Sequence, residues 1–196
     1  MHPSISDFPN NRFYDGKLED GVDRSDREAP AGMLWPDWDA PLAFLPVEGE
    51  ELLSPDGASK ENSVEASWVV KILMGLIEEG GLEFSSIGII TPYAGQVRAI
   101  RDMIPESMQD VEVRTVDGYQ GREKDVIIFS CVRSNPYGNV GFLSDRRRLN
   151  VALTRSRRGL IVVGNPETLR HDDNWRAWID HIRSSKLEAW HLLGTA

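Results

Sequence analysis

Short apolar runs alternate with amphipathic helical stretches along most of the chain, and this alternation limits the possible folds more than any other feature. Residues 42–47, 87–91, 111–116, 125–132 and 160–163 have the length and apolar character of buried strands. Helices are predicted between them, over residues 62–79, 93–104, 145–155 and 175–184. Strands of four to eight residues between longer helices are typical of an α/β fold, a mostly parallel sheet with helices on both faces.

The 196 residues suit a single domain, which we divide at residue 60. Residues 1–60 are an N-terminal lead-in: residues 1–40 are expected to be rich in loops, residues 42–47 form one short strand, and residues 48–60 form an acidic loop. Residues 61–196 form the core. Asn62 is the predicted N-cap of the first core helix, with Glu65 completing a capping box, and Gly80-Gly81 ends that helix.

The net charge of −9 is distributed unevenly along the chain. Residues 1–85 hold 18 acids and 6 bases, whereas residues 86–170 hold 9 acids and 13 bases. A local basic field can attract phosphate groups although the whole molecule is negative. A solvated basic face balanced by acidic neighbours fits the pattern equally well. The candidate basic cluster is Arg114, Arg122, Lys124, Arg133, Arg146, Arg147, Arg148, Arg155, Arg157 and Arg158.

Several classes of protein are excluded by composition. The single cysteine, Cys131, rules out an internal disulfide framework and a cysteine-rich zinc site. The four histidines lack metal-ligand spacing, so no residue is expected to hold a metal ion. No apolar run is long enough for a membrane span, and the first residues do not resemble a signal peptide. We therefore expect an intracellular protein, in the cytoplasm in preference to the nucleus.

Three polar segments lie at or just after predicted strands, where ligands of parallel sheets bind. In the first, residues 90–96, Pro92 begins a helix whose free N–H groups could hold a phosphate, and Tyr93 could stack on a base. The same residues are also consistent with a plain strand-to-helix turn around a packed tyrosine. Taken by themselves, residues 90–96 favour the plain strand-to-helix turn.

The other two segments contain the glycines and most of the arginines. In residues 115–125, Gly118 and Gly121 allow close approach of a ligand, and Glu123 could accept hydrogen bonds from a sugar; surface ion pairing is the alternative. In residues 141–158, Arg148 and Arg155 are seven residues apart and would project from the same side of a helix. Arginine binds phosphate with two parallel hydrogen bonds, although a solvated basic helix is common. Together the segments predict phosphate- or sugar-binding loops on one edge of the sheet, without specifying a reaction.

These three segments resemble motifs IV, V and VI of the superfamily 1 helicases, and most closely those of the up-frameshift type, the ATP-dependent RNA helicase of nonsense-mediated mRNA decay. The resemblance covers nearly all of residues 1–170, and the segments occur in the family's order. The stretches that carry it are residues 87–93 (Ile-Gly-Ile-Ile-Thr-Pro-Tyr), 116–125 (Val-Asp-Gly-Tyr-Gln-Gly-Arg-Glu-Lys-Asp) and 147–155 (Arg-Arg-Leu-Asn-Val-Ala-Leu-Thr-Arg).

The resemblance implies the second of two RecA-like domains, a three-layer sandwich that binds ATP with Mg²⁺ against the first RecA-like domain and moves along single-stranded RNA or DNA. Arg155 would be the arginine finger that stabilises charge developing on the γ-phosphate. Glu123 would hold the ribose, with Gln120 and Gly121 beside it. The residues implied to line the nucleic-acid path are Thr91, Pro92, Tyr93, Val116, Asp117 and Arg148.

The chain lacks two motifs that the complete helicases of this family contain. It contains no Gly-x-x-x-x-Gly-Lys-Ser/Thr phosphate loop and no Asp-Glu pair for Mg²⁺, both of which belong to the family's first domain. Family members carry Gln-Tyr-Arg just before the position of Met1. We therefore expect the chain to be half of a longer protein and inactive as an ATPase by itself.

Two other functions remain open. The chain could be a non-catalytic interaction module that keeps the helicase fold and binds protein partners through its acidic N-terminal half. It could also be an unrelated phosphate-binding α/β protein, which the length of the motif match disfavours. The basic residues between Arg114 and Arg158 favour the helicase.

Overall fold

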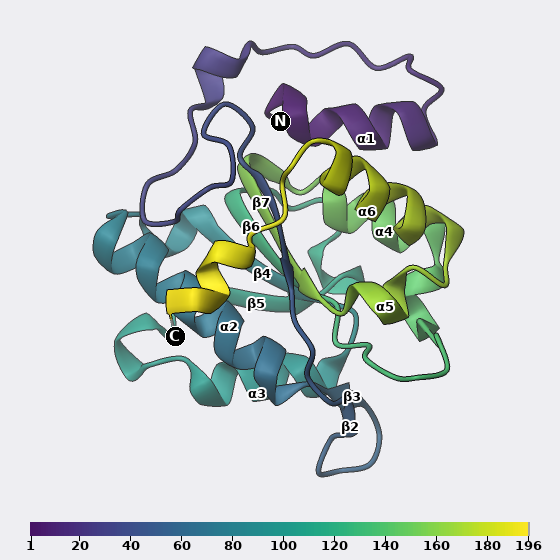
Figure 1. Ribbon diagram of the computed structural model, residues 1–196. Coiled ribbons are helices and arrows are strands. Elements are labelled where there is room, and N and C mark those ends of the chain that lie inside the picture. Colours follow the sequence, from purple (N-terminus) through teal and green to yellow (C-terminus); the bar gives the residue numbers. More distant parts are fainter. Residues whose placement is uncertain (196) are drawn as a thin grey trace.

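A five-stranded parallel sheet forms the centre of the protein, seen in a computed structural model that describes residues 1–195 (Figure 1). Its strand order is β1-β7-β6-β4-β5. The register pairs Phe44 with Val162, and Ile89 with both Val113 and Ile128. Every neighbouring pair is parallel, so all carboxyl ends lie on one edge. The strands are β1 (Leu42–Pro46), β4 (Ile87–Thr91), β5 (Glu112–Thr115), β6 (Lys124–Ser130) and β7 (Ser156–Gly164).

Helices cover both faces of the sheet (Figure 1). On one face lie α1 (Pro3–Phe13), α4 (Arg146–Leu153) and α6 (Asp173–Ser184), and on the other lie α2 (Ser63–Met74) and α3 (Ala94–Met103). A π-helical turn, Gly75–Glu79, extends α2. The short helix α5 (Pro166–Leu169) follows β7. The predicted α/β three-layer sandwich is confirmed.

Each face of the sheet has its own hydrophobic core. Trp175 and Trp178 of α6 pack edge to face on each other, and Trp178 also packs on Phe44 of β1. On the opposite face, Leu73 and Leu76 are fully buried against the sheet. Burial of such large side chains stabilises the fold by on the order of 2 kcal/mol each. The central strands have a core on both faces, which explains why they are apolar at successive positions. Cys131 and both tryptophans are buried, as predicted.

The N-terminal region is more ordered than predicted. Residues 3–13 form α1, although Pro9 and two asparagines give this stretch a poor helix propensity. Packing overrides propensity here, because Ile5 and Phe8 are buried and the His2 N–H donates to the Arg157 carbonyl at 2.8 Å. The acidic loop contains a hairpin of two short antiparallel strands, β2 (Leu52–Leu53) and β3 (Lys60–Glu61). The lead-in therefore contributes to three strands rather than one.

Residues 116–123 return along the sheet from the carboxyl end of β5 to the amino end of β6. This path is required because β5 and β6 are both parallel to β4. Tyr119, in the middle of the segment, is fully buried, and a Cβ on Gly88 of β4 would lie 1.9 Å from its hydroxyl. Gly88 is therefore the residue that lets the segment lie close to the sheet.

Candidate functional site

The predicted site residues form two groups at opposite ends of the sheet. Gln120, Gly121, Glu123 and Arg155 lie at the amino end, because Arg155 immediately precedes β7 and its carbonyl accepts the Lys124 N–H of β6 at 3.0 Å. The other six lie at the carboxyl end. The expectation that all three segments share one edge is therefore wrong, since a sequence pattern does not reveal that residues 116–123 run back along the sheet.

Arg155 lies just beyond α4 rather than on it. Because the helix ends at Leu153, Arg148 and Arg155 do not project from one side of it as predicted. The Arg155 guanidinium donates from Nε to the Val151 carbonyl at 3.1 Å, and from Nη2 to the Thr154 hydroxyl at 3.0 Å. The side chain is half-buried and has no carboxylate partner in the described part of the chain. Its charge is thus fixed in place without being neutralised, the state that suits anion binding.

The loop beside Arg155 is open to solvent. Arg155 Nη1 lies 3.5 Å from the Arg122 carbonyl, which joins the arginine to this loop. Gln120, Gly121 and Glu123 are exposed, and Gly121 has a φ of +75° that favours glycine. Arg157 donates two hydrogen bonds to Oε1 of Glu123, at 2.9 and 3.1 Å. These bonds do not use Oε2, the second oxygen of this exposed carboxylate. The structure therefore brings all four predicted nucleotide-binding residues together.

At the carboxyl end, the predicted nucleic-acid residues differ in accessibility. Thr91, Tyr93 and Val116 are buried, and the Val116 N–H donates to the Thr91 carbonyl at 3.0 Å. Pro92 is half-buried and Asp117 is exposed. The buried side chains shape this end of the sheet, and contact of the six residues with nucleic acid stays a prediction.

Arg148 and Asp117 form a two-pronged ion pair. Nε and Nη2 of Arg148 each donate to one carboxylate oxygen of Asp117 at 2.9 Å. Hydrogen bonding to this carboxylate raises the pKa of Arg148 further above its ordinary value. The pair joins the start of α4 to the residues that follow β5.

Most of the candidate basic cluster is paired with carboxylates, although three of its bases share the single carboxylate of Glu112. Seven of its ten residues form ion pairs: Arg114, Arg122 and Lys124 with Glu112, Arg133 with Glu51, Arg148 with Asp117, Arg157 with Glu123 and Asp125, and Arg158 with Asp125. Within residues 1–195, Arg146, Arg147 and Arg155 have no such pair. The solvated-face interpretation therefore holds for much of the cluster, and three of its arginines have no carboxylate partner in this part of the chain.

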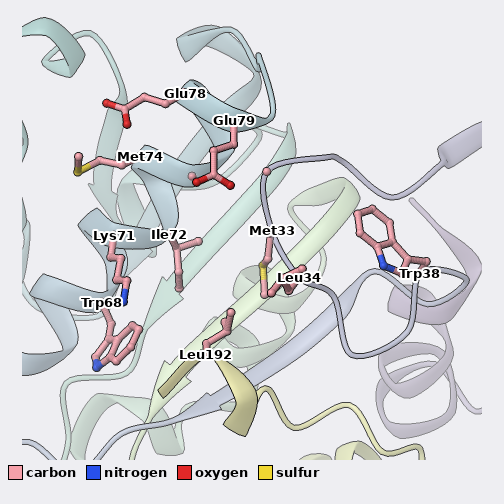
Figure 2. A pocket seen from close by; sticks show the side chains of 12 residues that line it. Met33, Leu34, Trp38, Trp68, Lys71, Ile72, Met74, Glu78, Glu79 and Leu192 are labelled. Atoms are coloured by element: carbon pink, nitrogen blue, oxygen red, sulfur yellow. The ribbon is translucent and has the colours of Figure 1, made fainter. Parts of the chain in front are cut away.

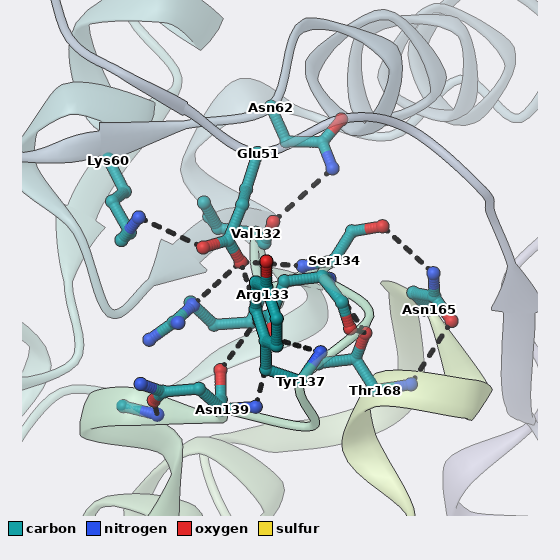
Figure 3. A network of polar contacts seen from close by, with 12 residues as sticks. Glu51, Lys60, Asn62, Val132, Arg133, Ser134, Tyr137, Asn139, Asn165 and Thr168 are labelled. Carbon is teal, nitrogen blue, oxygen red and sulfur yellow. Dashed lines mark hydrogen bonds and ion pairs between the residues drawn. The ribbon is translucent and has the colours of Figure 1, made fainter.

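A polar network absent from the predictions holds the loop after β6 (Figure 3). Glu51 accepts hydrogen bonds from Nε of Arg133 and from the Ser134 N–H, both at 2.8 Å, and pairs with Lys60 at 2.9 Å. Burial alone would raise the pKa of Glu51, but bonds from Arg133, Lys60, Asn135 and Ser134 outweigh it and lower the pKa to about 2. Glu51 stays ionised and fixes Arg133, which is nearly buried.

Glu65 does not have the role that the sequence predicted. Instead of completing a capping box, its side chain points inward and accepts hydrogen bonds from the Ser130 hydroxyl at 2.7 Å and the Val132 N–H at 2.8 Å. Burial raises the pKa of Glu65 to about 8. Val132 has a φ of +72°, which is strained for a β-branched residue. The hydrogen bond that its N–H donates to Glu65 and the one that its carbonyl accepts from Asn62 hold it there. The i, i+3 spacing of Asn62 and Glu65 is the same for either role.

An apolar cavity of about 610 Å³ opens beside α2 (Figure 2). Trp38 and Leu34 lie on one side, Trp68 and Met74 on the other, with carboxylates at one end. This concave surface is of the kind that protein partners use, and a partner there stays a prediction. Its lining residues are Gly32, Met33, Leu34, Trp38, Trp68, Lys71, Ile72, Met74, Gly75, Glu78, Glu79 and Leu192.

Residues 1–195 contain no group of three or more His, Cys, Asp or Glu side chains placed to hold a metal ion. None of the helices formed by this part of the chain has the length and apolar character that crossing a bilayer requires.

Comparison with known proteins identifies the family. Residues 1–167 match the family described as "AAA domain". The chain is 43% identical over 194 residues to "Regulator of nonsense transcripts 1" of Dictyostelium discoideum, which covers 95% of the chain and 14% of the relative. It is 41% identical over 194 residues to the Drosophila melanogaster homolog of that name, covering 95% and 16%. It is 44% identical over 195 residues to "ATP-dependent helicase upf1" of Schizosaccharomyces pombe, covering 93% and 20%.

The chain therefore spans between one seventh and one fifth of the length of these relatives. The match extends through all three motif segments and through the sheet that carries them. This chain belongs to the AAA domain family and is a helicase domain of the up-frameshift, or regulator of nonsense transcripts 1, type of superfamily 1.

Proposed function

We propose that this chain is the second RecA-like domain of an ATP-dependent superfamily 1 helicase that acts on single-stranded RNA or DNA. The observation that carries the proposal is the state of Arg155. Its guanidinium is fixed by backbone and hydroxyl oxygens, has no carboxylate partner among residues 1–195, and lies beside an exposed loop. A positive charge presented in this way is suited to a phosphate group brought by another domain.

The residues at the amino end fit a nucleotide. ATP supplies a phosphoanhydride whose hydrolysis drives the motor, and we propose that the first RecA-like domain holds its phosphates and its Mg²⁺. From this chain, Arg155 would contribute positive charge at the γ-phosphate, since three of its five N–H groups are used and two remain. Oε2 of Glu123 could accept hydrogen bonds from the ribose hydroxyls, with Gln120 and Gly121 alongside.

The carboxyl end of the sheet would contact the nucleic acid. Pro92 and Asp117 are accessible there, and Arg148 is held beside them by its ion pair. Arg147, in the first turn of α4, is exposed and has no ion pair in the described part of the chain. We therefore place the phosphate backbone of the strand near the beginning of α4. The domain would then use one end of its sheet for ATP and the other for nucleic acid.

Arg155→Ala tests the proposal in a polypeptide that carries a phosphate-loop domain ahead of this chain. Loss of the finger should lower kcat by on the order of 10³-fold or more and leave ATP binding nearly unchanged. Arg155→Lys should restore little of the lost kcat, because a single ammonium group cannot both keep the hydrogen bonds that hold Arg155 and contact the phosphate. Steady-state ATPase assays and equilibrium nucleotide binding measure these effects.

Arg158→Ala is the matched control. Arg158 also lies at the start of β7, but it pairs with Asp125 and bonds the Glu28 carbonyl, so its removal should leave turnover within a few-fold. The chain alone should show no ATP turnover above background. Unchanged kcat in Arg155→Ala, or clear turnover by the chain alone, would refute the proposed role.

A further inference from the structure

Of the neighbouring rings of Tyr93 and Phe142 at the carboxyl end, only that of Phe142 is exposed. Tyr93 is 6% exposed, and its hydroxyl accepts a hydrogen bond from Nη1 of Arg133 at 3.2 Å. Phe142 is 55% exposed and lies directly beside it, with ring centroids 5.4 Å apart and planes inclined by 42°. The buried tyrosine therefore supports the exposed phenylalanine from behind.

Phe142 occupies a fixed position although it lies in a loop. Its N–H donates to the Tyr93 hydroxyl at 3.4 Å, and the preceding Gly141 N–H donates to Oδ1 of Asn139 at 3.0 Å. Gly141 has a φ of +55°, and a Cβ there would lie 2.0 Å from Nη1 of Arg133. Only glycine allows the loop to approach the Arg133–Tyr93 pair this closely. A ring held in this way loses little conformational entropy when a ligand binds it.

A cation lies next to the exposed ring. The Arg148 guanidinium carbon is 5.2 Å from the ring centroid of Phe142, within the range of a cation–π contact. The two-pronged ion pair between Arg148 and Asp117 keeps this guanidinium in place. An aromatic ring beside a fixed arginine offers a stacking surface for a base together with a donor for the phosphate or sugar attached to it.

A cavity of about 430 Å³ separates Phe142 from the β2–β3 hairpin. Leu53 and Lys60 of the hairpin face Tyr93, Arg133 and Phe142 across it. Its volume is within the ~300–1,000 Å³ typical of small-ligand sites. An apolar wall and an aromatic ring match the flat apolar faces of a base. Lys60 and Arg133 share the carboxylate of Glu51, which leaves one positive charge in excess for the anionic backbone of a nucleotide.

We propose that an unpaired base of the bound strand stacks on the exposed ring of Phe142, in the cavity between that ring and the β2–β3 hairpin. The inference rests on the proposed function, since it adds a base-binding position to the nucleic-acid path at the carboxyl end. Stacking on a ring does not read a particular base, so the site contributes affinity without sequence preference.

Phe142→Ala and an abasic strand test the stacking directly. The whole chain is titrated into two fluorescent single-stranded RNAs of equal length, one normal and one with abasic residues throughout, and anisotropy gives each Kd at low salt. Phe142→Ala should weaken binding of the normal strand about tenfold, the loss expected for one stacked base, and leave binding of the abasic strand unchanged. Phe142→Trp should retain normal binding, whereas Phe142→Leu, which keeps apolar volume, should behave like alanine.

Tyr137→Ala is the matched control, because Tyr137 is 87% exposed in the same loop but does not line the cavity. It should bind both strands like the wild-type chain. Two results would overturn the stacking site while keeping the proposed function: equal binding of the normal strand by wild type and Phe142→Ala, or an equal loss on both strands. If the wild-type chain binds neither strand at any salt concentration, the proposed nucleic-acid end fails and the stacking site with it.

Discussion

Glu65 is a carboxylic acid enclosed completely by the protein, and this places it in an unusual protonation state. Burial raises its pKa to about 8, so the folded chain holds it neutral at pH 7. It is nevertheless needed, because its Oε2 accepts the N–H of the strained Val132 and the hydroxyl of Ser130. Cys131, between those two residues, also has a raised pKa because it is buried near Glu65. The loop that leads to Arg133 therefore depends on a buried acid that is neutral at pH 7.

Glu65→Gln should change how stability depends on pH. In the unfolded chain Glu65 ionises near pH 4.5, whereas in the folded chain it ionises only near pH 8. Between those values the folded state binds the extra proton, so wild-type stability falls as pH rises, by up to about 1.4 kcal/mol per unit. The amide of glutamine does not titrate, so the variant should lack this fall and exceed the wild type in stability at pH 8.

Urea unfolding at several values between pH 5 and pH 8 measures the difference. This range excludes Glu51, whose lowered pKa makes its contribution present above about pH 4.5 and lost only on acidification. Glu106→Gln, at an exposed position, should follow the wild type. Parallel curves for wild type and Glu65→Gln would show that Glu65 is ionised in the folded protein.

At the scale of elements, the sequence predicted most strands and helices but not how the chain connects their ends. Residues 87–91 were predicted to the residue, because a continuous apolar run is the direct mark of a strand buried on both faces. Helix α1 was missed because packing of Ile5 and Phe8, not propensity, stabilises it.

The sequence proposed the candidate site residues, but it did not predict how the fold groups them. Arg155 and Glu123 follow from the family motif, and their meeting at the amino end follows from a return path that periodicity does not encode. Phe142 went unnoticed because an aromatic residue after a glycine has the same pattern whether a loop buries or exposes it. Exposure is set by Tyr93 and Arg133, which are distant in sequence.

Asn62→Ala should be more harmful than loss of an ordinary helix cap. The Asn62 side chain accepts the Glu65 N–H at the start of α2, and its amide also donates to the Gly49 and Val132 carbonyls. Loss of a cap costs about 1 kcal/mol, and leaving buried groups without partners adds about 1–3 kcal/mol. We expect a total of roughly 2–4 kcal/mol from chemical unfolding.

Asp172→Ala provides the comparison. Asp172 caps α6 by accepting the Asn174 and Trp175 N–H groups, but it is only half-buried and joins no second element. Its removal should cost about 1 kcal/mol. Equal losses for the two variants would mean that the bonds from Asn62 to Gly49 and Val132 contribute nothing beyond capping.

At the scale of the whole molecule, an acidic protein must bind a polyanion through local charge. The net charge of −9 opposes association, and seven of the ten clustered basic residues are paired with carboxylates. Attraction therefore depends on where the arginines without a carboxylate partner lie. Among the described residues, Arg146 and Arg147 lie at the carboxyl end, where α4 begins, and Arg155 lies at the amino end.

Arg147→Gln and Arg155→Gln each make the net charge more negative by one, yet we expect only the first to weaken single-stranded RNA binding. If Arg147 neutralises one phosphate, its loss should reduce the slope of log Kd against log salt concentration by ~0.7, as well as lowering affinity at low salt. Arg155→Gln should leave both the slope and the affinity at wild-type values, because its guanidinium lies at the opposite end of the sheet. Titrations between 50 and 200 mM salt, a range over which such binding changes strongly, resolve the two variants. Equal effects would mean that the total charge of the chain controls binding, and the division of the domain into an ATP end and a nucleic-acid end would have to be abandoned.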